Sequence, residues 1–173
     1  MKNPLFLRIW EGVVRLLEGT VVTIFGALVF AVLWGVVSRY LPGIRPSAWT
    51  EELAISLLVW LTLLGAALGF RSHAHLGVDY FVNKLEPSAS KAAVVLGEVT
   101  VFGFAAFALV YGGWRLVTET LATGQITPVL QWPMGWLYAA APISGIFICA
   151  FCIEHLLRPA AFSSPASELS LAD

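Results

Sequence analysis

Long apolar stretches dominate the chain, and charged residues are confined to the short segments between them. Four intervals contain no Asp, Glu, Lys or Arg: residues 19–38, 53–70, 99–114 and 120–153. An α-helix needs about 20 apolar residues to cross roughly 30 Å of hydrocarbon. The third interval reaches this length once residues before Glu98 are included, and the last helix is expected to start near Pro133. Because a backbone in lipid must satisfy its own hydrogen bonds, the pattern predicts an all-α membrane protein with four transmembrane helices.

A short amphipathic pattern separates the second span from the third. Its apolar residues recur at i, i+3, i+4 and i+7, at Val78, Phe81, Val82 and Leu85. This spacing is typical of a helix with one apolar side, so we expect a short interfacial amphipathic helix between the second and third spans.

The domain organisation follows from the same pattern. We expect residues 1–158 to form one membrane domain and the Ala-, Ser- and Pro-rich residues 159–173 to form a disordered cytoplasmic tail. The loop between the third and fourth spans contains Gly124 and Pro128 and is expected to be irregular.

Composition agrees with a membrane protein. Of the 173 residues, 58% are hydrophobic and 12% are charged, whereas about 25% of a soluble domain is charged. The net charge is -1, with no long run of like charges, which argues against a nucleic-acid partner and leaves the lipid bilayer as the surroundings. The residues before the first span show no convincing cleavage site, so we interpret that span as a retained signal anchor.

Lys and Arg are divided unequally between the two sides of the membrane. Seven of the ten lie before the first span, in the second loop or after the fourth span, and three lie in the first and third loops. Positive residues are enriched on the cytoplasmic side. The distribution therefore predicts a multi-pass protein of the bacterial inner (plasma) membrane with cytoplasmic N- and C-termini.

Opposite charges flank the first loop. Arg39 ends the first span, and Glu51 and Glu52 open the second. Two interpretations stay open: an ion pair between Arg39 and a glutamate, and glutamates that complement the positive end of the second helix behind a Thr50 cap.

Small residues mark two spans as sites of close helix packing. In the second span, Glu52 and Trp60 share a face, and Gly65 and Gly69 form a small-xxx-small step. The partner helix belongs either to this chain or to another subunit. The fourth span repeats the theme with Gly135, Ala139, Ala141 and Gly145. Pro142 is expected to kink this span near the middle of the membrane.

Groups that carry chemistry are scarce. No ionisable residue lies at the centre of a span, where ion pathways normally need one. Glu98, about one turn into the third span, is expected to be an interfacial or subunit-paired carboxylate. Histidines lie at span ends, where a transmembrane haem bundle does not use them, and Cys149, Cys152 and His155 lack a fourth metal ligand. We therefore expect no catalytic residue, no cofactor, no metal site and no enzymatic activity.

A series of motifs resembles a known family. Residues 71–79, Arg-Ser-His-Ala-His-Leu-Gly-Val-Asp, follow the second span, and Trp-Thr-Glu-Glu at residues 49–52 opens it. With Arg39-Tyr40 and the run from Pro133 to Tyr138 before Pro142, these motifs resemble the DctQ-like small permease subunit of tripartite ATP-independent periplasmic (TRAP) transporters. The resemblance covers roughly residues 10–158. His75 and Asp79 match the family pattern, whereas His73 and Ala74 stand where members often have a glycine.

The resemblance implies a complex. A periplasmic solute-binding protein would deliver an organic acid or related solute, and a large membrane subunit, expected as a separate chain, would carry it inward with sodium. This chain would be a non-catalytic scaffold that supports the large subunit and helps to dock the binding protein. His75 and Asp79 would position the interfacial helix. Two other functions stay open: a self-sufficient small proton-coupled transporter with Glu98 as its carboxylate, and, with less support, a haem-carrying redox membrane subunit.

Overall fold

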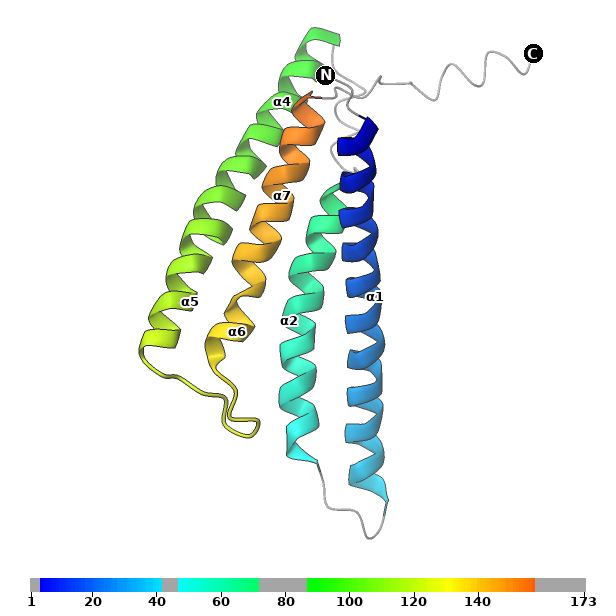
Figure 1. Cartoon of the computed structure of the whole chain (residues 1–173), viewed down its shortest axis with the longest axis vertical. Helices are drawn as coiled ribbons and strands as arrows, with labels where there is room; N and C mark the ends of the chain where they lie inside the picture. Colours follow the sequence, from blue (N-terminus) through cyan, green and yellow to red (C-terminus); the bar gives the residue numbers. More distant parts are fainter. Residues whose placement is uncertain (1–3, 42–46, 72–86, 158–173) are drawn as a thin grey trace, which may run out of the picture.

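A computed structural model of the chain describes residues 4–41, 47–71 and 87–157 (Figure 1). Within these residues four helices are long and apolar enough to cross a membrane, which confirms the predicted all-α membrane fold. The predicted interfacial helix, with His75 and Asp79, and the predicted tail at residues 159–173 lie outside the described residues.

The first two spans are single helices that extend beyond their charge-free intervals. They are α1 (Pro4–Tyr40) and α2 (Ala48–Arg71). α1 begins at a proline, and the missing N–H of a proline costs no hydrogen bond at the first helical position. Charged side chains near both ends remain compatible with the helix because long side chains reach the headgroup level.

The third span is one continuous rod of three segments. These are α4 (Pro87–Phe104), the π-helix η1 (Ala105–Gly112) and α5 (Gly113–Ala122). The apolar span runs from Val95 to Ala122 and therefore includes Glu98. In η1 the backbone bonds widen to i→i+5, which offsets the residues after it from the register of α4.

The fourth span is interrupted, but not at the middle of the membrane. It consists of α6 (Met134–Tyr138) and α7 (Ala140–Leu157), with Ala139 between them. Proline perturbs the turn before it because it has no N–H and its ring clashes with an earlier carbonyl. The interruption therefore precedes Pro142 and lies near the start of the span, and Pro142 itself falls within the first turn of α7, where its missing donor is tolerated.

The spans lie side by side in a single row rather than in a square bundle. α1 contacts α2, α2 contacts α7, and α7 contacts α4 and η1. Among the described residues, the backbones of α1 and α7 do not come close, nor do those of α2 and α4, and α1 reaches α7 through the side chain of Trp10. Figure 1 shows this order across the view, with α7 between α2 and the rod of α4 and α5. Burial agrees: 39% of the most apolar window of the fourth span is buried, against 6% in the first and third spans.

The buried core lies toward one end of the helix axes, the end at which α1 begins and α7 ends. This end is called the terminus end here (Figure 1). Its buried residues come from every span: Val14, Leu17, Leu64, Ala67, Phe70, Ala105, Ile148, Phe151 and Cys152. Large apolar side chains such as Phe30, Leu33 and Phe107 remain exposed. In a membrane protein such side chains face lipid or another membrane subunit.

Candidate functional site

The first loop joins two helices that are held together by a buried polar network. Ser38 and Thr50 keep 1% and 2% of their surface exposed. The Ser47 hydroxyl lies 3.1 Å from the Ser38 hydroxyl and 2.8 Å from that of Thr50. Thr50 also lies against Gly35 of α1, since a Cβ added to that glycine would stand 3.0 Å from the Thr50 hydroxyl oxygen. Gly35 therefore permits the close approach of α1 and α2.

This arrangement corrects the predicted helix cap. α2 begins at Ala48, so Thr50 lies inside its first turn instead of preceding it. The Thr50 hydroxyl donates to the Ser47 carbonyl over 2.8 Å. Residue 47 therefore occupies the capping position, and the sequence interpretation placed the helix start too late.

The two glutamates at the start of α2 have different partners. Arg39 and Glu51 form an ion pair of 2.9 Å, with side chains 59% and 66% exposed. An exposed pair contributes about 0 to 1 kcal/mol. Glu52 accepts hydrogen bonds from the backbone N–H groups of Val129, over 2.7 Å, and Leu130, over 3.4 Å. Glu52 therefore anchors the third loop on α2.

The third loop forms no helix or strand, as expected, but its own hydrogen bonds order it. After α5, Gly124 has a φ of 64° and donates to Leu121, and Gln125 donates to Thr120, the two bonds of a Schellman motif. Beyond it, Thr127 donates to Trp132 over 2.8 Å. The loop therefore holds the amides that face Glu52 in a defined position.

A second polar cluster lies at the terminus end. His155 Nδ1 of α7 lies 3.0 Å from Glu98 Oε1 of α4, with side chains 11% and 13% exposed. The Phe70 ring stacks on His155 at a centroid distance of 5.5 Å, and Cys152 lies beside the carboxylate. Glu98 thus has a partner within the same chain.

Trp10 connects the first span directly to the fourth at the same end. Its indole N–H donates to Glu154 over 2.7 Å, and its ring packs edge-on against Phe151 at 5.7 Å. Arg71, at the end of α2, pairs with Glu18 of α1 over 3.7 Å. The four spans are therefore linked by polar side-chain contacts at this end.

Glycines of the fourth and third spans mediate internal packing. A Cβ at Gly145 would lie 2.8 Å from Leu109 Cβ and 2.9 Å from Val110 Cγ2 of η1. A Cβ at Gly113 would lie 2.9 Å from Pro142 Cδ. The fourth span is thus packed against the third at glycine distances, as its small residues predicted.

Gly65 and Gly69 of α2 behave differently. A Cβ at either position would meet no atom of the described residues within 4 Å. Gly69 lines an apolar groove of 620 Å³ between α2 and the third span, floored by Ile148 of α7. Trp60 of the same helix is half-buried against the core. Among the described residues, none therefore lies within contact distance of a Cβ added to this small-xxx-small step.

Several contacts at the two ends of the helices could not be predicted from the sequence. Backbone amides such as those of Val129 and Leu130 are invisible in a residue pattern, and Glu98 and His155 meet only because α7 lies beside α4. Among the described parts of the chain, no three His, Cys, Asp or Glu side chains are grouped so as to hold a metal.

Comparison with known proteins identifies the protein family to which the chain is similar. A family model described as "Tripartite ATP-independent periplasmic transporters, DctQ component" matches residues 28–162. A Haemophilus influenzae protein named as a TRAP transporter small permease protein is 28% identical over 144 residues, which is 83% of this chain and 86% of that protein.

Two further relatives carry substrate names. The C4-dicarboxylate TRAP transporter small permease protein DctQ of Rhodobacter capsulatus is 30% identical over 101 residues, 58% of this chain and 44% of that protein. The sialic acid TRAP transporter permease protein SiaT of Haemophilus influenzae is 27% identical over 133 residues, 76% of this chain and 20% of that protein. Since the family match extends over most of the four spans, the chain belongs to the DctQ family of TRAP small permease subunits, as a multi-pass protein of the inner membrane.

Proposed function

We propose that this chain is the fixed, non-catalytic scaffold of a sodium-coupled TRAP transporter that takes up an organic acid or related solute. The observation that carries the proposal is the row of helices, whose apolar flanks and open α2 groove offer a long surface to a larger membrane partner. Within the described spans, the ionisable side chains lie toward the ends, and several of them pair with each other or with backbone amides.

The partner in this proposal is a large TRAP membrane subunit in a separate chain. The alignment with one fifth of SiaT supports it, because a segment similar to this chain there forms part of a much longer permease protein. The relatives named for C4-dicarboxylates and sialic acid support an organic acid as the solute, since both compounds carry carboxylates. A periplasmic solute-binding protein completes the proposed complex.

The groove beside Gly69 is the proposed contact with the large subunit. Its walls are Leu63 and Ala66 of α2 on one side and Val101 and Phe104 on the other. Helices in lipid associate where small residues let their backbones approach closely. Gly65 and Gly69 provide such a surface, and no described residue of this chain occupies it.

The proposed orientation places both termini and the segment between α2 and α4 in the cytoplasm, from the distribution of Lys and Arg. Reporter fusions at Met1 and Asp173 test it. A cytoplasmic reporter should be active at both ends, and periplasmic activity at either end would contradict the topology.

His75 and Asp79 are proposed to position the interfacial segment, since a spacing of four lets their side chains meet along one helical turn. Alanine at either position should lower complex yield or transport rate without changing which solute is taken up. A changed solute preference would overturn this role.

Reconstitution tests the function as a whole. Proteoliposomes that contain this chain alone should accumulate no organic acid, whereas the chain with its large subunit, a matching binding protein and an inward sodium gradient should. Omission of each component in turn is the control, and replacement of sodium by potassium tests the coupling ion. Uptake by this chain alone under a proton gradient would favour the proton-coupled alternative, with Glu98 as the first residue to replace. A visible haem spectrum of the purified chain would favour the redox alternative.

A further inference from the structure

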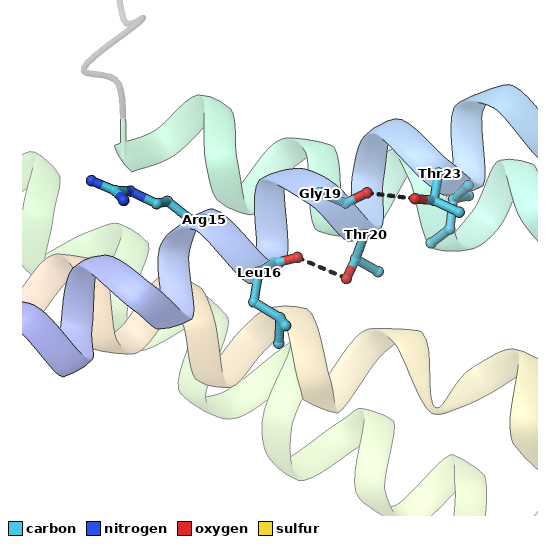
Figure 2. A pocket seen from close by; sticks show the side chains of 6 residues that line it. Arg15, Leu16, Gly19, Thr20 and Thr23 are labelled. Atoms are coloured by element: carbon cyan, nitrogen blue, oxygen red, sulfur yellow. Dashed lines mark hydrogen bonds between the residues drawn. The ribbon is translucent and has the colours of Figure 1, made fainter.

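One exposed side of α1 carries a shallow groove that no part of the proposed function uses. The groove is open to the surroundings, has a volume of about 510 Å³ and is lined by Arg15, Leu16, Gly19, Thr20, Thr23 and Ile24 (Figure 2). Its hollow lies at Gly19, where an added Cβ would meet no atom of the described residues within 4 Å. The groove therefore exists because this position lacks a side chain.

The two threonines make the groove wall apolar in effect. The Thr20 hydroxyl donates to the Leu16 carbonyl and the Thr23 hydroxyl donates to the Gly19 carbonyl, each over 2.8 Å. Figure 2 shows both bonds running along the helix. Since the hydroxyl protons are already used, an alkyl chain can lie against this wall without leaving a polar donor unsatisfied.

Arg15 stands at the terminus end of the groove. Its side chain points away from Thr20 and Thr23 in Figure 2. Along an ideal helix, Arg15 and Arg39 are about 36 Å apart, and the hydrocarbon layer is roughly 30 Å thick. The Arg15 guanidinium can therefore reach the headgroup level while the groove below it lies beside the acyl chains.

The charges around Arg15 favour an anion. Arg8 lies two turns earlier on the same exposed side of α1, with Glu11 between them. Glu18, on the other side of Arg15, is paired with Arg71 of α2 over 3.7 Å. Among the described residues neither Arg8 nor Arg15 forms an ion pair. Among the described residues, this side of α1 thus carries two cations without an ion pair, and one of its two acids, Glu18, is engaged by Arg71.

We propose that this surface of α1 is a binding site for an anionic phospholipid of the bilayer. The phosphate lies at the Arg15 guanidinium, whose planar fork donates two hydrogen bonds to phosphate oxygens. One acyl chain lies along the groove over Gly19, between Leu16 and Thr23. The cation and the groove are adjacent on one helix, so one molecule engages both.

Native mass spectrometry of the full chain in mild detergent tests the site, with dioleoylphosphatidylglycerol and dioleoylphosphatidylcholine as probes. The wild-type chain should retain the anionic lipid about fivefold more strongly. Arg15→Gln should abolish this preference and Arg15→Lys should keep most of it. Gly19→Leu should displace the lipid by filling the groove.

Two matched controls separate the site from general effects. Arg115→Gln removes another exposed cation, at the far end of the third span, and should keep the lipid preference. Gly26→Leu enlarges another open glycine of α1 and should keep the bound lipid. Circular dichroism and elution volume show that each variant is folded.

Three results would overturn the proposal. Equal retention of the two lipids by the wild-type chain would exclude selection for anionic headgroups. Equal losses in Arg15→Gln and Arg115→Gln would show a general charge effect. Unchanged lipid retention in Arg15→Gln, with weaker recovery of the large subunit, would assign Arg15 to a protein carboxylate instead.

Discussion

Glu98 and His155 are hydrogen-bonded across 3.0 Å, although they come from different spans and lie 57 residues apart in the sequence. Both side chains are largely buried, and the second carboxylate oxygen of Glu98 has no hydrogen-bond partner among the described residues. The pair therefore joins α4 to α7 in buried surroundings, where the loss of either partner is expected to destabilise the fold.

Replacing His155 with alanine is expected to lower the free energy of unfolding by about 1 to 3 kcal/mol, because it leaves a buried carboxylate oxygen unpaired. Glu98→Gln should cost less, since an amide oxygen still accepts from His155. Unfolding in mixed micelles measures both changes. The double variant should lose less than the sum of the single variants, and additive losses would show that the two residues do not interact.

Glu52→Ala is expected to release the third loop, because the carboxylate accepts from the amides of Val129 and Leu130. Their hydrogen exchange should accelerate about tenfold, equivalent to about 1.4 kcal/mol. Glu51→Ala is the matched control, since among the described residues that carboxylate pairs with the exposed Arg39 and not with the third loop. Equal acceleration in both variants would contradict the anchoring role of Glu52.

Gly145→Ala is expected to destabilise the chain by about 1 to 3 kcal/mol, because the new methyl group would crowd Leu109 and Val110. Gly69→Ala should not destabilise the isolated chain, since its Cβ would meet no described atom within 4 Å and alanine favours helix by about 1 kcal/mol. Thermal unfolding of the two purified variants compares them. A destabilised Gly69→Ala would mean that α2 is packed more closely than the structure shows.

Leucine at Gly65 or Gly69 is expected to leave the isolated chain folded and to reduce co-purification with the large subunit, because it fills the open face of α2. Gly97→Leu is the control, since a Cβ at Gly97 also meets no described atom within 4 Å but this glycine lies on α4, away from the small-xxx-small step of α2. Recovery of the large subunit on a tagged small subunit is the measurement. Full recovery with both α2 variants would place the interface elsewhere.

The sequence was sufficient for the number of spans, and it offered an ion pair between Arg39 and a glutamate as one of two interpretations without distinguishing Glu51 from Glu52. A charge-free stretch of helical length identifies a span, and a short loop returns its two flanking charges to one level. It was insufficient for the order of the spans. Helices that are apolar on every side have no polar face to mark their neighbours, so the position of α7 beside both α2 and η1 could not be predicted.

The same limit applies to the glycines. Gly69 and Gly145 both read as small residues on apolar helices, yet one lies open beside a groove and the other contacts η1. The difference depends on which helix comes opposite, which is a property of the tertiary arrangement. The π-helical segment Ala105–Gly112 likewise has no recognisable signal in its residues.

The row of spans determines how far the chain reaches within the plane of the membrane. Four helices in a square would share four packing seams, whereas the observed order has three. With axes about 8 to 10 Å apart, a row of four extends roughly 35 Å edge to edge, against about 20 Å for a square. The loss of one seam therefore nearly doubles the length of the chain in the membrane plane. A chain of this size can then lie along a long edge of a larger neighbour while remaining one helix thick.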